Sequence, residues 1–386
     1  MPYYLPQGRG WPPSPVHHPL QIRTTPPHHH TTTTITTITT TMASTTSSTA
    51  PIHLSPPGSD PSRARRAAAG AGMAAYAAPS LFQPHHAREA VRDAAAGRIA
   101  PLAAYYAALP SVAVTRMVAP MGWDCVWIDW EHSAMGVETM TTMVHESIFM
   151  SQGKTIPFVR VPGHDHASIG YALDAGASLI IPQVETVSQA RHVISSAKFG
   201  ASRRGPAGTR SAPPFRLVPG LTDSAAFTPS AMHPDVHACL NDQAAIMLQV
   251  ETRAGIGQLD AVLAAVGSDV DLVWLGTLDA RVSMGLPGHG GLGGAEPAWR
   301  EAVDLFDATC RKYGVPRGGF AFGQGGPLRG RELVRHCEEK SLAFVVVTGD
   351  VMALAGMNGE LAAAREAWAA KGQGGEGEEE DKKQVE

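Results

Sequence analysis

The sequence lacks the features that mark several large classes of protein. Its longest apolar runs have the length of a strand and fall far short of a membrane span, so we expect a soluble protein. Lysine and arginine together number 31 against 35 acidic residues, so no basic excess points to nucleic acid. The four cysteines are widely scattered without a C-x-x-C pair. This argues against a zinc knuckle or a disulfide framework and fits a reducing compartment such as the cytoplasm.

Nucleotide-binding motifs are absent as well. No strand-like run is followed by G-x-G-x-x-G at the start of a helix, so a dinucleotide-binding fold lacks its signature. No G-x-x-x-x-G-K-[ST] segment occurs either. We expect the glycine-rich segments Gly285–Gly294 and Gly323–Pro327 to be flexible loops, with phosphate binding an alternative for the second.

The two ends of the chain have compositions that do not build a core. Residues 1–79 are rich in threonine, serine and proline, and such a segment cannot offset its ordering entropy by apolar burial. Its arginines and hydroxyl residues fit a mitochondrial transit peptide, and equally a true start at Met42 or Met73. Residues 371–386 form a charged Gly/Glu/Lys tail. We expect both ends to be disordered and residues 80–370 to form the folded domain.

Between these ends, apolar runs of strand length alternate with amphipathic helical stretches. Such alternation implies a parallel sheet, and eight units in residues 80–370 predict an α/β fold, a (β/α)₈ TIM barrel. An open doubly wound sheet is the alternative architecture. The expected strands are Leu102–Ala107, Cys125–Trp130, Ile156–Val161, Ser178–Gln183, Ile246–Glu251, Leu272–Thr277, Gly318–Phe322 and Ala343–Gly349.

Polar side chains gather at the C-terminal ends of these strands, where barrel enzymes place their active sites. Asp129 and His132 follow the second strand, and Arg160 ends the third. Each alone has a bland explanation as a cap, a loop histidine or a salt-bridged arginine. Their joint placement favours a catalytic site. The spacing of three residues places Asp129 where it can orient the ring of His132.

Two carboxylates end the fifth strand and follow the sixth. Glu251 and Asp279 would meet on one face of a parallel sheet and form an oxygen-rich site suited to a divalent metal. Mg²⁺ is the expected ion, with Mn²⁺ or Co²⁺ as alternatives. The competing interpretation is that both acids are helix N-caps. No lysine falls at a strand end, so a Schiff-base aldolase is excluded and any carbanion chemistry should depend on the metal.

Several segments, in this order, resemble the HpcH/HpaI aldolase / citrate lyase β family, whose type members are metal-dependent 4-hydroxy-2-oxoheptanedioate aldolases. The resemblance covers roughly residues 80 to 365. The combination of Leu81–His85, Asp129–His132 and Thr209–Arg216 also resembles the fungal macrophomate synthase branch of that superfamily. The segments of the wider resemblance are Gly122–His132, Pro157–Pro162, Ala172–Ala177, Ile181–Thr186, Leu248–Thr252 and Gly276–Asp279.

The resemblance implies a role for each site residue. Glu251 and Asp279 would ligate the metal, while Gln249 and the backbone around Leu278 and Asp279 would hold a keto acid. His132 would be the acid/base, and Arg160 would stabilise the developing oxyanion. Asp174 would raise the basicity of the histidine. A pyruvate-like substrate can chelate the metal through its carboxylate and keto oxygens, so the metal would spread the enolate charge.

The resulting hypothesis is a carbon–carbon lyase that forms a pyruvate enolate, by retro-aldol cleavage of a 4-hydroxy-2-oxo acid or by decarboxylation of oxaloacetate. Alternatives are macrophomate-synthase-like bond formation from oxaloacetate and a pyrone, an acyl-CoA lyase of the citramalyl or malyl type, and a non-catalytic scaffold. The resemblance also implies trimers or hexamers that exchange a C-terminal helix, for which Val351–Ala370 is the candidate. Two loops depart from the aldolase pattern, Gly276–Arg281 and Arg203–Phe215, and leave the electrophile open.

Overall fold

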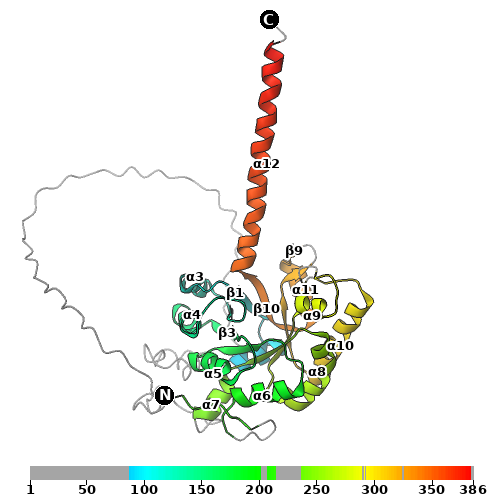
Figure 1. Ribbon diagram of the computed structural model, residues 1–386. Helices are drawn as coiled ribbons and strands as arrows, with labels where there is room; N and C mark the ends of the chain where they lie inside the picture. Colours follow the sequence, from blue (N-terminus) through cyan, green and yellow to red (C-terminus); the bar gives the residue numbers. More distant parts are fainter. Residues whose placement is uncertain are drawn as a thin grey trace, which may run out of the picture. The chain divides into compact units, whose positions relative to one another are not determined.

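The chain folds into a closed barrel of eight parallel strands, as the sequence predicts (Figure 1). The computed structural model describes residues 87–200, 207–213, 236–288, 291, 293–323 and 326–383. Strands neighbour one another in the order β1-β10-β7-β6-β5-β4-β3-β2. Their bounds are β1 Leu102–Ala107, β2 Cys125–Asp129, β3 Ile156–Arg160, β4 Ser178–Ile181, β5 Ile246–Val250, β6 Leu272–Leu275, β7 Arg317–Phe320 and β10 Leu342–Gly349.

All eight expected strands are therefore confirmed, and most end one or two residues earlier than the apolar runs suggest. A two-stranded hairpin, β8 Phe322–Gly323 with β9 Gly326–Pro327, follows β7. The helices are α2 Ala87–Ala95, α3 Val112–Val118, α4 Val137–Met150, α5 His166–Ala175, α6 Val187–Ala197, α7 Val236–Gln243, α8 Arg253–Val266, α9 Thr277–Ser283, α10 Pro297–Tyr313, α11 Gly330–Lys340 and α12 Asp350–Lys383. Single 3₁₀ turns occur at Ala119–Met121 and Gly267–Asp269.

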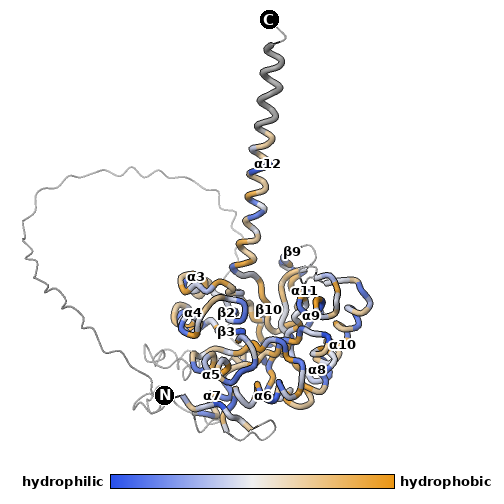
Figure 2. The backbone as a smooth tube through the Cα atoms, viewed as in Figure 1, coloured by the Kyte–Doolittle hydropathy of each residue, from blue (hydrophilic) through white to orange (hydrophobic). Residues whose placement is uncertain are grey.

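Alternate residues of each strand face two different apolar cores. In Figure 2, much of the backbone tube in the barrel is orange, which marks hydrophobic residues. Residues such as Val126 pack toward the surrounding helices, while Trp127 points into the barrel. Inside, Trp127 meets Trp274 edge-on with ring centroids 4.9 Å apart. Gly318 is required beside them, because a Cβ there would collide with the Trp274 ring. The interior is thus a packed aromatic core that supports the strand ends above it.

Side-chain caps fix the starts of α6 and α8 relative to the strands that precede them. Thr252 accepts a hydrogen bond from the backbone N–H of Gly255 and caps α8, and Thr186 forms a capping box with Gln189 at the start of α6. The short connections between strand and helix leave little freedom at the end of the barrel that carries the candidate site.

The domain boundaries drawn from composition stay predictions. Residues 1–79 lie outside the described residues. The helix α12 includes residues 371–383, where the sequence predicts a disordered tail. The side chains of residues 371–386 lie outside the described residues, so the end of the domain at residue 370 stays untested. Among the described residues, no helix is long and apolar enough to cross a membrane.

A buried ion pair closes the N-terminal end of the barrel. Arg88 in α2 donates from Nε to Asp271 Oδ1 at 2.8 Å, and the two side chains are only 8 % and 2 % exposed. Asp271 Oδ2 also accepts the backbone N–H of Ile246 at 2.9 Å, where β5 begins. This carboxylate therefore joins α2, β5 and β6 at the end of the barrel opposite the candidate site.

We predict that Asp271→Ala lowers the free energy of unfolding by about 3 kcal/mol, because the buried Arg88 loses its closest carboxylate and keeps only the more distant Asp242, at 3.7 Å. Urea denaturation followed by circular dichroism measures the loss. The matched control is Asp260→Ala, whose partner Lys312 is 58 % exposed while Asp260 itself is 52 % exposed. The control should change stability little, and equal effects of the two variants would contradict the prediction.

Candidate active site

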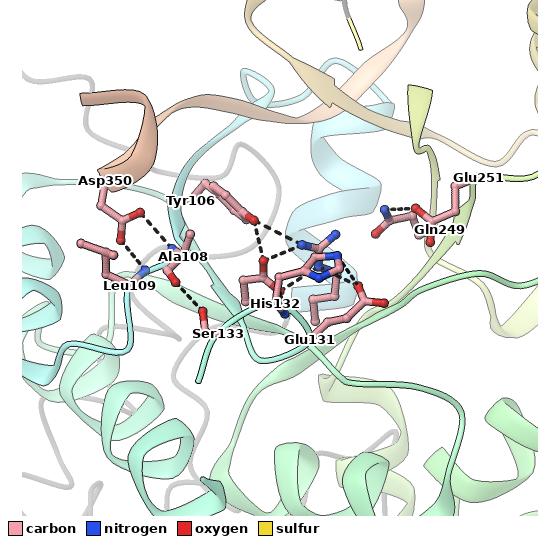
Figure 3. A network of polar contacts seen from close by, with 11 residues as sticks. Tyr106, Ala108, Leu109, Glu131, His132, Ser133, Gln249, Glu251 and Asp350 are labelled. Carbon is pink, nitrogen blue, oxygen red and sulfur yellow. Dashed lines mark hydrogen bonds and ion pairs between the residues drawn. The ribbon is translucent and has the colours of Figure 1, made fainter. Parts of the chain in front are cut away.

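An ion pair between neighbouring strands forms the centre of the site (Figure 3). Asp129 ends β2 and lies in register with Arg160 at the end of β3. Arg160 donates from Nε to Asp129 Oδ1 at 2.9 Å and from Nη2 to Asp129 Oδ2. Both side chains are buried. A bidentate pair of this kind fixes the plane of the guanidinium and thus the direction of its remaining N–H groups.

Tyr106, near the end of β1, is a member of the site that the sequence analysis missed. Its hydroxyl donates to Asp129 Oδ2 and accepts from Arg160 Nη2 at 3.2 Å. The ring packs edge-on against Trp127, over which the guanidinium of Arg160 also lies. Its position in the sequence could have indicated this role, because it lies next to the C-terminal end of the first expected strand, where barrel enzymes place site residues.

The surroundings of Asp129 keep it ionised. Burial opposes the charge, but the hydrogen bonds and charge of Arg160 and the hydroxyl of Tyr106 outweigh burial and hold the pKa of Asp129 below its usual value. Asp129 Oδ1 also accepts the backbone N–H of His132 at 3.2 Å. The expected contact with His132 therefore runs through its backbone, and not through its ring as the spacing suggests.

The ring of His132 lies beside another acid. Its Nε2 is 3.5 Å from Glu131 Oε2, and its side chain is 65 % exposed, so the ring is open to solvent and substrate. Glu131 Oε2 also lies 3.3 Å from Arg160 Nε. Burial raises the pKa of Glu131 despite the attraction of Arg160 and His132, and the charges of Asp129 and Asp279 raise it further.

The two carboxylates expected as metal ligands lie on the same rim. Burial raises the pKa of Glu251 to about 7, and the negative charges of Asp279 and Glu131 contribute to this shift. Glu251 Oε1 accepts the backbone N–H of Gln183 at 2.8 Å, and Oε2 accepts from Gln249 Nε2. Glu251 is buried, whereas Asp279 is exposed to solvent. A buried carboxylate beside a solvent-accessible one offers the oxygen donors that suit a hard divalent cation.

Two further observations fit a cation at this place. Gln249 Oε1 is buried and has no hydrogen-bond partner, so an acceptor oxygen next to Glu251 is unsatisfied. Gly276 leaves room for Glu251, because a Cβ at residue 276 would collide with its Oε2. Within the described residues no group of three or more His, Cys, Asp or Glu side chains is arranged to hold a metal. The protein would thus supply two carboxylates and leave the other coordination positions to substrate and water.

The alternative that these acids are helix N-caps is wrong. The cap of α8 is Thr252 and the cap of α9 is Gly276, so Glu251 precedes the first cap and Asp279 lies in the first turn of α9. Both carboxylates are therefore available for a ligand. Leu278, between the cap of α9 and Asp279, has an exposed side chain.

Asp174 lies apart from the other expected site residues. It sits near the C-terminal end of α5, just before β4 begins, and so belongs to the opposite end of the barrel from His132. Its Oδ1 accepts from Arg210 Nη2 at 2.7 Å, and the guanidinium of Arg210 packs on Phe199. Since no contact joins Asp174 to His132 within the described part of one chain, the expected effect on the histidine would require a second copy.

Arg281 is a buried anchor and does not face the site. It is fully buried and donates to both carboxylate oxygens of Glu296, at 2.7 and 3.0 Å, and to the carbonyl of Pro287. Thr277 also donates to the carbonyl of Gly291. These contacts tie the glycine-rich segment to α9, where the sequence suggests a flexible loop. The Arg203–Phe215 loop lies largely outside the described residues.

The lysines of the described ranges lie away from the C-terminal ends of the strands. Lys198 is buried, and desolvation lowers its pKa to about 8, a property that a Schiff-base lysine needs. However, it follows α6 and contacts the residues that precede β5, at the end of the barrel opposite the site. Lys154 and Lys340 likewise precede β3 and β10. No lysine within the described ranges follows a strand end.

Comparison with known proteins agrees with this geometry. Residues 103–317 match the family model described as HpcH/HpaI aldolase/citrate lyase. A hydroxypyruvate/pyruvate aldolase of Roseovarius nubinhibens is 32 % identical over 52 % of this chain and 76 % of its own. A 4-hydroxy-2-oxovalerate aldolase of Novosphingobium aromaticivorans is 31 % identical over 55 % of this chain and 74 % of its own. The crystal structure of macrophomate synthase has a TM-score of 0.60 at 29 % identity and covers 73 % of this chain and 90 % of that one.

We predict that Mg²⁺ or Mn²⁺ binds at the Glu251–Asp279 pair and raises the melting temperature, because a cation offsets the cost of ionising the buried Glu251 beside the charge of Asp279. Glu251→Gln should weaken binding by at least about tenfold, which is 1.4 kcal/mol. Isothermal titration calorimetry and thermal denaturation with and without EDTA measure both effects. The control Glu185→Gln changes an acid that accepts a hydrogen bond from Thr252 and should bind metal normally. Unchanged affinity in Glu251→Gln would place the metal elsewhere.

Proposed function

Since the chain belongs to the HpcH/HpaI aldolase/citrate lyase family, we propose that it is a metal-dependent carbon–carbon lyase that forms a pyruvate enolate. The reaction is retro-aldol cleavage of a 4-hydroxy-2-oxo acid or decarboxylation of an oxaloacetate-like acid. The observation that carries the proposal is the gathering of Glu251, His132 and the fixed guanidinium of Arg160 at the strand ends, with the charge of Asp279 acting on Glu251. Figure 3 shows Glu251 and His132 in this arrangement. Both reactions leave negative charge on a keto oxygen, and this rim offers positive charge to receive it.

Glu251 and Asp279 would hold a divalent cation, whose Lewis acidity stabilises negative charge on the keto oxygen of the substrate. Gln249 and the backbone of Leu278 and Asp279 would orient the keto acid beside this pair. Because the contacts of Gln249 include the carboxylate of Glu251, the amide is already placed at the edge of the site.

Arg160 would stabilise the developing oxyanion. Its Nε and Nη2 atoms are taken by Asp129, Glu131 and Tyr106, and no partner for Nη1 occurs among the described residues. The bidentate pair therefore leaves one edge of the guanidinium free to donate to substrate. Such a preorganised donor costs no reorganisation during the reaction.

His132 would move the proton of the aldol hydroxyl, directly or through a water. A histidine titrates near neutral pH, and the exposed ring can reach a bound substrate. We propose that Asp129 acts on this residue by holding its backbone, while Asp174 would reach a histidine only across an interface between two copies.

The electrophile is set by the loops around the rim. Arg281 is neutralised by Glu296 and buried, so it does not supply a charge for a second carboxylate of the substrate. A second candidate function is bond formation from oxaloacetate and an acceptor such as a pyrone, which the likeness to macrophomate synthase favours. An acyl-CoA lyase would need a basic patch for the adenosine phosphates, and the sequence offers only Arg203 and Arg204.

We also propose that the chain forms trimers or hexamers through α12. Val351, Leu354, Leu361 and Trp368 are exposed on this helix, and such a row of apolar side chains is typical of a helix that packs on a partner. Leu354→Glu with Leu361→Glu should therefore reduce the mass measured by light scattering. Met117→Glu, at an exposed position of α3, is the control, and an unchanged mass in the double variant would contradict the proposal.

Turnover tests the proposed chemistry. After EDTA treatment and return of Mg²⁺ or Mn²⁺, the wild type should release pyruvate from oxaloacetate or from 4-hydroxy-2-oxo acids. Arg160→Lys keeps the charge but loses the planar fork, so we expect kcat to fall by about 10²-fold or more while metal affinity stays unchanged. Metal binding without turnover of either substrate would favour the acyl-CoA lyase, and the absence of both would favour a non-catalytic scaffold.

A further inference from the structure

The loop that carries His132 is connected to the start of α12 by hydrogen bonds. Asp350, the first residue of α12, is buried at the seam where β10 meets β1. Its Oδ1 accepts the backbone N–H of Ala108 at 3.0 Å, and its Oδ2 accepts that of Leu109 at 2.9 Å. On the other side, the hydroxyl of Ser133 donates to the carbonyl of Ala108. All of these groups are drawn in Figure 3.

One peptide group lies in the middle of this chain of hydrogen bonds. The N–H of Leu109 and the C=O of Ala108 belong to the same peptide plane. The N–H points to the charged Asp350, and the C=O receives the hydroxyl of Ser133. A charged acceptor polarises a peptide, so its carbonyl becomes a stronger acceptor on the far side. The two hydrogen bonds should therefore strengthen each other.

The seam is built to bring these groups close together. Gly349 is in register with Tyr106, and a Cβ at residue 349 would collide with the carbonyl oxygen of Tyr106. Only glycine allows the end of β10 to approach the end of β1 so closely. Asp350 is the next residue in the chain, so its carboxylate lies within hydrogen-bond distance of the first residues of the β1–α3 connection.

The position of the His132 ring depends on such backbone anchors. The ring is largely exposed, so little packing holds it in place. Two hydrogen bonds hold the backbone next to this ring. Asp129 accepts the backbone N–H of His132, and the hydroxyl of Ser133 donates to the carbonyl of Ala108. We propose that Asp350 and Ser133 are positioning residues for the acid/base loop and act on it through the peptide between Ala108 and Leu109.

This positioning role rests on the proposed function in one respect: Asp350 and Ser133 can affect the reaction rate only if His132 acts as the acid/base. Their effect on the order of the loop does not depend on that role. It also couples α12 to the site, since the residue that begins this helix is the one that holds the peptide. A change in the position of the first turn of α12 would reach His132 through two hydrogen bonds.

The test compares Asp350→Asn, Ser133→Ala and the double variant in the full-length, metal-loaded protein. Hydrogen–deuterium exchange of the peptide that spans residues 130–136 reports the order of the loop, and pyruvate release reports kcat and KM. Metal affinity by calorimetry reports the Glu251–Asp279 pair. The matched control is Ser111→Ala, which removes a hydroxyl from the same β1–α3 connection but only uncaps α3.

Each single variant should speed exchange in residues 130–136 and lower kcat by about tenfold, with KM and metal affinity within about twofold of wild type. Because both act through one peptide, the double variant should be no more than about threefold worse than either single variant. Ser111→Ala should lower the melting temperature without changing exchange in the loop. Additive losses near a hundredfold, or unchanged exchange in both single variants, would overturn the proposal. If wild type releases no pyruvate, the proposed function fails, and the exchange data still decide the positioning role.

Discussion

The buried pair of Asp129 and Arg160 is the interaction on which the arrangement of the site depends. Removing two charges from water costs several kcal/mol for each ion, and only close bidentate geometry with further hydrogen bonds offsets that cost. Here Tyr106 and the backbone N–H of His132 complete the shell of the carboxylate. The pair joins β1, β2, β3 and the loop after β2. Its rigidity therefore sets the direction of the guanidinium, and with it the place where negative charge can develop.

The carboxylate side of the site has the reverse electrostatics. Burial raises the pKa of Glu251 and of Glu131, and the negative charge of Asp279 raises both further. A bound cation would offset this cost, so metal affinity would be gained at the expense of the stability of the metal-free fold. In the proposed reaction, the fixed guanidinium and the carboxylate pair would face one substrate from two sides.

The two ends of the barrel have different tasks. At the N-terminal end, Arg88 and Asp271 hold α2, β5 and β6 together, and the buried Lys198 donates to the carbonyl of Asn241 in α7. At the C-terminal end, the connecting segments are tied by contacts that face away from substrate: Arg281 secures the loop after α9, and Asp350 secures the segment after β1. A long-range contact from the last strand thus supports the loop after the second, which is possible because a closed barrel makes β1 and β10 neighbours.

The sequence by itself determined the eight strands, the barrel and the positions of Asp129, Arg160 and Glu251 at strand ends. Apolar runs and their polar ends are local features, and a parallel barrel gathers all strand ends at one rim. It did not show that Asp129 bonds Arg160 and the backbone of His132, because partners across strands depend on register. Tertiary structure likewise decided the roles of Tyr106, Asp174 and Arg281. Tyr106 lies in the site, Asp174 lies at the opposite end of the barrel, and Arg281 is buried against Glu296. In each case the side chain's role follows from what packs beside it, and contacts between distant residues leave no local mark in the sequence.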